Sequence, residues 1–149
     1  MSGDFLDSNV FVYLFDETDE RKRDAAEGIV TSALQNHNAC ISFQVVQETL
    51  NVLTRKVAAP MSVEDAKNFM EEVLRPLWRV SPSPALYNRA LDIHARYRYG
   101  FYDSLIVAAA LDAGCTRLYS EDLQGGQRIE ALTIENPFFD GRIACRTST

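Results

Sequence analysis

The sequence is poor in the residues that build disulfide, zinc or histidine-based sites. It has three cysteines and two histidines in 149 residues. An odd number of widely spaced cysteines suits neither a disulfide framework nor a zinc site, so Cys40, Cys115 and Cys145 are expected to be reduced, mostly structural thiols. The motifs GxSxG, GxxxxGK[ST] and GxGxxG are also absent, which removes the usual signatures of serine hydrolases and of nucleotide-binding loops.

Long apolar segments are missing as well. No stretch approaches the roughly 18 apolar residues of a membrane span, and the first residues, MSGDFLDSNV, show no basic segment followed by an apolar one. The expected protein is therefore cytoplasmic, without membrane association. Its 15 basic and 21 acidic side chains give a net charge of -6, which is opposite in sign to that of a strong, nonspecific nucleic-acid binder.

The composition that is present, 46% hydrophobic and 24% charged residues, is typical of a globular domain. We expect one domain over residues 1–139 and a flexible tail over residues 140–149. Short apolar segments alternate with amphipathic ones, which predicts an α/β fold with a central, mainly parallel sheet. The predicted strands are 4–6, 40–41, 78–80 and 117–120, and the predicted helices are 18–35, 42–57, 62–74, 83 to about 97–100, and 103–113, with 8–15 as a strand end or short helix.

Three aspartates fall where predicted strands end or predicted helices begin. Asp7 ends the first strand, Asp122 follows the strand at 117–120, and Asp103 lies in the first turn of a helix. The carboxyl ends of parallel strands and the N-termini of the following helices share one edge of a sheet, so these three side chains are expected to converge. Each also has a purely structural explanation, as a helix cap for Asp7 or Asp103 and as a turn residue for Asp122.

Converging carboxylates favour a hard divalent cation. Like charges repel unless they are neutralised, and a site of oxygen ligands alone suits Mg²⁺ or Mn²⁺. Such ions activate water and stabilise charge on phosphate oxygens without a histidine base, so phosphodiester hydrolysis is the natural reaction. Of the two histidines, His94 shares a predicted helical face with Tyr87 and Leu91 and is expected in core or boundary packing, and His37 lies in a polar loop.

Glu48 is a weaker candidate by periodicity. On the predicted helix over 42–57 it borders the apolar arc near Val52, but it also adjoins the polar face of Gln44, Asn51 and Arg55. The helical pattern alone therefore predicts a solvated side chain at this position.

With these residues identified, the chain resembles the PIN-domain ribonucleases, specifically the VapC-type toxins of VapBC toxin–antitoxin pairs, from Asp4 to Phe138. Four segments carry the resemblance, in the order of the family: FLDSNVFVY, SFQVVQETLNVLTRK, YGFYDSLIVAAALDAGC and LYSEDLQGGQRIEALTIENPF. The resemblance implies that the catalytic and metal-binding residues are Asp7, Glu48, Asp103 and Asp122. It further implies the supporting residues Ser120, Asn9 and Glu121, of which Glu121 is an alternative ligand beside Asp122.

The resemblance also implies a three-layer α/β/α domain, Mg²⁺ or Mn²⁺ as cofactor, cleavage of RNA, a homodimer, and inhibition by a cognate antitoxin. The basic residues that are candidates for contacts with RNA are Arg55, Lys56, Arg96 and Arg98. The last two alternate with tyrosines just before Asp103. Their alternative interpretation is an ordinary solvated helix surface.

Two other functions remain open. A noncatalytic module of the same fold would bind RNA or a protein without cutting it, although the presence of all four acids argues against this. An aspartate-based phosphotransfer or receiver domain would also place acids and Mg²⁺ at strand ends, and DSNV is faintly similar to its nucleophile motif. The lysine that such domains carry after a late strand has no counterpart here.

Overall fold

The computed structural model describes residues 3–123 and 125–138, so the predicted tail over 140–149 lies outside the described residues. The strands are β1 (Asp4–Leu6), β2 (Ala39–Ser42), β3 (Trp78–Val80), β4 (Arg117–Tyr119), β5 (Arg128–Ile129) and β6 (Leu132–Glu135). The helices are α1 (Ser8–Val12), η1 (Tyr13–Phe15), α2 (Glu20–Asn36), α3 (Phe43–Arg55), α4 (Val63–Phe69), η2 (Met70–Leu74), α5 (Arg75–Leu77), α6 (Pro84–Tyr97) and α7 (Phe101–Asp112). The predicted strands and the main predicted helices are confirmed within a few residues.

The six strands form one sheet in the order β3-β2-β1-β4-β6-β5. All neighbouring pairs are parallel except β5 with β6, which forms an antiparallel hairpin at one edge. The mainly parallel sheet is therefore confirmed. The hairpin was not predicted, because β5 has only two residues and is too short for an alternating pattern.

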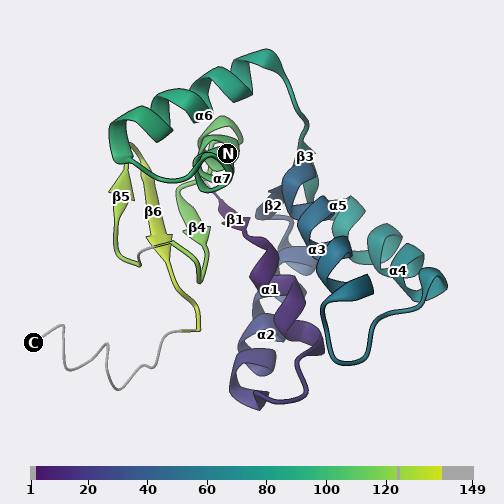
Figure 1. The fold of residues 1–149 in the computed structure, drawn as a ribbon. Helices are drawn as coiled ribbons and strands as arrows, with labels where there is room; N and C mark the ends of the chain where they lie inside the picture. The colour runs from purple at the N-terminus through teal and green to yellow at the C-terminus, as the bar shows by residue number, and fades with distance from the viewer. Residues whose placement is uncertain (1–2, 124, 139–149) are drawn as a thin grey trace, which may run out of the picture.

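Helices flank the sheet, as the predicted α/β fold requires. The chain runs from β1 through β2 to β3 in one direction across the sheet, with α2 and then α3 to α5 in the connections, and it returns to β4 through α6 and α7. Connections between parallel strands are right-handed. The helices of the connections from β1 to β3 therefore lie on one face of the sheet, and the helices of the connection that returns to β4 lie on the other. Figure 1 shows α6 and α7 gathered in the upper part of the view and α1 to α5 below and to the right.

Burial follows this arrangement. Phe5 and Leu6 of β1 are fully buried on successive positions, as expected for a central strand that is covered on both faces. In α7 every residue from Ser104 to Ala110 is buried, so this helix lies inside the molecule rather than on its surface. Leu132 and Ile134 of β6 are buried whereas Thr133 and Glu135 are exposed, which marks a strand with one solvated face.

Local signals explain where the helices begin and end. The hydroxyl groups of Ser62 and Ser83 accept hydrogen bonds from the backbone N–H groups of Asp65 and Leu86, respectively, and so cap α4 and α6. The helix predicted over 62–74 is confirmed, but its last part, η2, has π geometry, which hydrophobic spacing does not reveal. Across residues 3–123 and 125–138, no helix is both long and apolar enough to cross a membrane.

Candidate metal centre

Asp7 lies at the end of the central strand, with its carboxylate held from two sides. Its Oδ2 accepts a hydrogen bond from the hydroxyl of Ser120 at 2.7 Å, and its Oδ1 accepts one from the backbone N–H of Ser8, also at 2.7 Å. Asp7 is the N-cap of α1, which is the structural role that the sequence offered, and this role is compatible with a place in the metal site. The side chain is 4% exposed.

This environment disfavours a charged Asp7. Burial raises the pKa of Asp7 to about 7, against the lowering effect of the hydrogen bonds from Ser120 and Ser8. The negative charges of Glu48 and Asp122 raise it further. A buried carboxylate with other acids beside it is stabilised in its charged form only by a nearby positive charge.

Glu48 projects from α3 toward the same place. The amide of Gln44, one turn earlier, donates a hydrogen bond to its Oε2 at 3.3 Å, and the side chain of Ser8 also hydrogen-bonds to it. Glu48 is half-buried rather than solvated, which differs from the expectation of the helical pattern alone. Burial raises its pKa first, and the charges of Asp122 and Asp103 raise it as well.

Asp103 and Asp122 complete the group. Asp103 lies in the first turn of α7, where burial and the charge of Asp122 raise its pKa. Asp122 follows β4 and is exposed, and its Oδ2 accepts a long hydrogen bond of 3.4 Å from the amide of Asn9. Hydrogen bonds connect the four positions across the carboxyl edge of the sheet: Ser120 binds Asp7, Asn9 binds Asp122, and the amide of Gln44 binds both Glu48 and the backbone carbonyl next to Asp103.

The supporting residues have different surroundings. Ser120 is fully buried and bonds directly to Asp7. The two oxygens of Glu121 are engaged elsewhere: the hydroxyl of Tyr13 donates to Oε1 at 2.5 Å, and the ammonium of Lys22 lies 2.9 Å from Oε2. These contacts join the loop after β4 to η1 and α2. They direct Glu121 to a structural ion pair instead of to the other acids.

The four acids offer oxygen ligands of the kind that a hard divalent cation binds, but their side chains are not arranged as a ready metal-binding group. Within residues 3–123 and 125–138, no three Asp, Glu, His or Cys side chains form a group that is ready to hold a metal ion. Mg²⁺, however, commonly takes one or two carboxylates and keeps several waters. Two buried amide oxygens near the acids, Asn9 Oδ1 and Gln44 Oε1, have no hydrogen-bond partner in the described part of the chain. Both oxygens are closed to solvent, so each amide contacts the acidic group through its N–H groups.

The basic and aromatic candidates for RNA contacts lie on the surface. The four basic candidates, Arg55, Lys56, Arg96 and Arg98, are all exposed. Tyr102, beside Asp103, is 68% exposed, and its ring packs edge-on against Phe101 at 5.5 Å between centroids. His94 is exposed rather than packed in the core, so that expectation was wrong: its Nδ1 lies 2.5 Å from the backbone carbonyl of Tyr99, beyond the end of α6.

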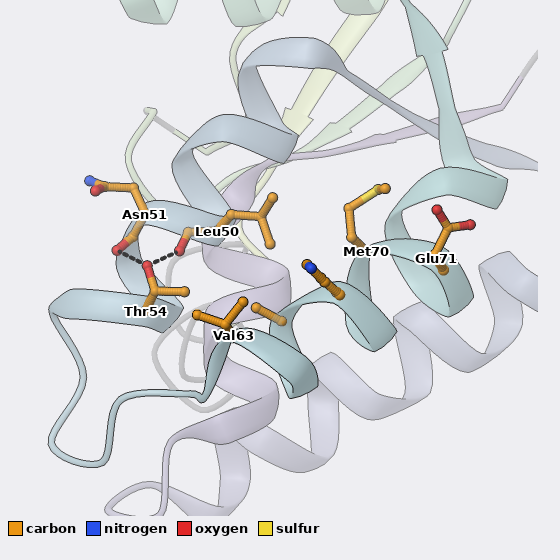
Figure 2. Close-up of a pocket in the computed structure, with 8 residues that line it drawn as sticks. Leu50, Asn51, Thr54, Val63, Met70 and Glu71 are labelled. Carbon is orange, nitrogen blue, oxygen red and sulfur yellow. Dashed lines mark hydrogen bonds between the residues drawn. The ribbon is translucent and has the colours of Figure 1, made fainter.

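A separate apolar groove of about 520 Å³ lies between α3 and the α4–η2 segment. Figure 2 shows Leu50, Val63 and Met70 at this groove, with Asn51, Thr54 and Glu71 at its border. Leu50 is two residues after Glu48, so the groove adjoins the helix that carries one of the acids without containing the acidic group. Its lining is suited to an apolar side chain rather than to a phosphate or a cation.

Comparison with solved structures shows the same fold in toxin–antitoxin assemblies. A toxin–antitoxin complex from Klebsiella pneumoniae matches with a TM-score of 0.64 and 14% identity, over 91% of this chain and 98% of that one. DNA-bound VapBC from Salmonella typhimurium matches with a TM-score of 0.64 and 21% identity, over 92% and 99%. VapC20 of Mycobacterium tuberculosis, described as a Sarcin-Ricin loop cleaving toxin, matches with a TM-score of 0.58 and 21% identity, over 80% and 90%.

At these identities the structural matches establish the fold. A search of curated proteins finds no match. The family model of the PIN domain matches residues 5–127, a range that begins within β1, extends beyond β4 and includes all four acids at the carboxyl edge of the sheet. The match covers well over half of the chain and agrees with the parallel sheet and its flanking helices. The chain therefore belongs to the PIN domain family.

Proposed function

We propose that this protein is a metal-dependent endoribonuclease that hydrolyses RNA phosphodiester bonds, and that it is the toxin of a toxin–antitoxin pair. One arrangement carries the proposal: four carboxylates from distant parts of the chain, Asp7, Glu48, Asp103 and Asp122, lie at one edge of the sheet. Ser120 donates to Asp7, Asn9 donates to Asp122, and the amide of Gln44 donates both to Glu48 and to the backbone carbonyl next to Asp103. Membership of the PIN domain family and the resemblance of four sequence segments to VapC-type toxins support the same reaction.

The four acids would hold Mg²⁺ or Mn²⁺ together with water. When bound, such a cation lowers the pKa of a coordinated water and balances the charge that develops on phosphate oxygens. The contribution of the chain is orientation: Ser120 and the N–H of Ser8 fix the carboxylate of Asp7, and Asn9 binds that of Asp122. Because these contacts exist before substrate binds, little reorganisation is needed when the reaction begins.

The decisive experiment is cleavage of a mixed cellular RNA pool by the purified protein in Mg²⁺ or Mn²⁺. We expect discrete products that disappear with a chelator and that fall by at least about 100-fold for Asp103→Asn, because the N-terminal turn of α7 loses its anionic ligand. Cleavage that persists with both the chelator and the substitution would refute the metal mechanism. Binding of RNA without any cleavage would favour the noncatalytic module, and phosphate covalently attached to Asp7 would favour the phosphotransfer domain.

RNA contacts are proposed along the exposed rim around α7. Single-stranded bases stack on exposed aromatic rings, and such stacking contributes about 1–3 kcal/mol per base. Tyr102 has a 68% exposed side chain beside Asp103, and Arg96 and Arg98 lie on the segment that leads into α7. None of the salt bridges among residues 3–123 and 125–138 involves either arginine. The guanidinium of Arg96 lies over the ring of Tyr97, 5.4 Å from its centroid, and no carboxylate of the described residues neutralises its charge, so it can still pair with a phosphate.

For Tyr102→Ala we expect the KM for RNA to rise by about 5- to 100-fold with kcat changed by less than about threefold, because the ring binds substrate and takes no part in the reaction. Steady-state cleavage of a short labelled RNA measures both constants. Tyr102→Phe keeps the ring and is the matched control, with a KM close to that of the wild type. An unchanged KM in Tyr102→Ala would remove the ring from the RNA path.

The remaining parts of the proposal concern partners and location. A homodimer would bring two copies of the exposed basic residues together and so offset the net charge of -6 near the substrate. A cognate antitoxin is proposed as the inhibiting partner, supported by the toxin–antitoxin complexes of the same fold. The domain is proposed to extend over residues 1–139, and the protein is proposed to act in the cytoplasm, where its substrate and antitoxin are made.

A further inference from the structure

Gln44 is a polar residue whose burial the helical pattern of the sequence did not indicate. It is the second residue of α3 and lies on the polar side of the predicted helix, yet its side chain is only 4% exposed. Residues four apart on a helix face each other, so Gln44 is placed directly against Glu48. A hydrogen bond from Gln44 joins the first turn of α3 to the start of α7, 58 residues later in the chain.

The amide of Gln44 has two acceptors as neighbours. Its Nε2 donates to Glu48 Oε2 at 3.3 Å and to the backbone carbonyl of Tyr102 at 3.1 Å. The opposite orientation of the amide would place its oxygen against these two oxygens, so the orientation is determined by the hydrogen bonds. One side chain thus links the carboxylate of Glu48 to the helix turn that carries Asp103.

The carbonyl oxygen of Gln44 has no such partner. Oε1 is buried and lacks a hydrogen bond within the described part of the chain. Leaving a buried acceptor unsatisfied destabilises the folded state, so an apolar residue of similar size would be favoured if packing were the only requirement. Asn9 repeats the arrangement: its Nδ2 donates to Asp122 Oδ2, and its Oδ1 is buried without a partner. Two of the four acids are therefore each bound by an amide with an unused oxygen.

We propose that Gln44 is a positioning residue of the metal site: its N–H groups orient Glu48 and hold α3 against the start of α7. The inference rests on the proposed metal-dependent function and adds one residue to it. Groups that orient metal ligands typically change metal affinity or activity by about 10- to 100-fold when they are removed. Gln44 does not touch the reacting atoms, so it acts through Glu48 and through the start of α7.

Gln44→Leu tests this proposal, because leucine fills a similar volume and makes neither of the two polar contacts. Titration calorimetry of the full chain with Mn²⁺ alone is the main readout, and kcat and KM for RNA are measured alongside. We expect Mn²⁺ affinity to fall by about 10- to 100-fold, kcat at low Mn²⁺ to fall in parallel, and KM for RNA to stay the same. Gln47→Leu is the matched control, since Gln47 is an exposed glutamine on the same helix, and its Mn²⁺ affinity should remain within about twofold of the wild type.

The outcomes separate this inference from the proposed function. A folded Gln44→Leu protein with wild-type Mn²⁺ affinity would overturn it, whether or not the wild type cuts RNA. Wild-type protein that binds Mn²⁺ but cuts no RNA would refute the ribonuclease proposal. The role of Gln44 would then be decided by the Mn²⁺ affinity of Gln44→Leu compared with that of the wild type. Gln44→Met, with a flexible chain that adapts to the space, is the second variant. If neither variant folds, Gln44 is required for the structure and the proposed role is wrong.

Discussion

Replacing Asp7 with asparagine is expected to lower kcat for RNA cleavage by about 10³-fold or more while leaving the fold intact. Asparagine has nearly the same shape, and its carbonyl oxygen can still accept one of the hydrogen bonds that Ser120 and Ser8 donate to the carboxylate. The negative charge is lost at the most buried of the four acids, so the cation binds more weakly and the charge on the transition state is less well balanced. Single-turnover cleavage of a labelled RNA in saturating Mg²⁺ measures the effect.

A matched control for this substitution is Asp92→Asn. Asp92 is an exposed aspartate on α6, and no salt bridge among residues 3–123 and 125–138 includes it. Its replacement changes the net charge by the same amount and is expected to alter kcat by less than about twofold. Asp7→Asn activity within tenfold of the wild type would mean that Asp7 is not a metal ligand, and the hydrogen bonds around it would then be purely structural.

Without metal, the free energy of unfolding of the wild type is expected to fall by about 2–4 kcal/mol relative to Asp7→Asn as the pH rises from 4 to 8. Burial raises the pKa of Asp7 from 3.8 to about 7 in the folded protein. Between these values the folded state keeps a proton that the unfolded state has released, so stability decreases with pH across this window and levels off above about 7. Each pKa unit corresponds to about 1.4 kcal/mol, and three units set the upper limit.

Urea unfolding in the presence of a chelator measures this difference at several pH values. Glu48 and Asp103 also have raised pKa values and add a decrease of the same sign, but they are present in both proteins, so the difference isolates Asp7. Addition of Mg²⁺ at pH 8 is expected to recover stability in the wild type, by about 2.7 kcal/mol at 100 times its Kd. Parallel pH profiles for the two proteins would show that the carboxylate of Asp7 is not penalised by its surroundings.

The elements that could be predicted from the sequence are those whose signal is local. Periodicity and capping serines located the strand over 78–80 and the starts of α4 and α6, because an apolar pattern or a cap depends on residues close in sequence. The β5–β6 hairpin and the π turns of η2 were missed for the opposite reason. A two-residue strand is defined by its pairing partner, and a π turn by how its helix packs.

The candidate site also has a part that local sequence signals predicted and a part that they did not. Strand ends and helix starts predicted that Asp7, Asp103 and Asp122 would meet, since the edge of a parallel sheet follows from element order alone. Glu48 appeared solvated by its helical position and entered through resemblance to a family. In the structure it is half-buried, and its pKa is raised first by that burial and then by the charges of Asp122 and Asp103, which lie on other elements.

The sequence by itself determined the α/β class, the acidic residues and the absence of the motifs of other enzyme classes, because these depend on composition and local pattern. Only the tertiary structure decided which polar side chains serve the acids. It turned Glu121 toward Tyr13 and Lys22, and it enclosed Gln44 between Glu48 and the start of α7. Such contacts join residues far apart in the chain, and burial, which sets both the raised pKa values and the unpaired amide oxygens, exists only once the helices have packed.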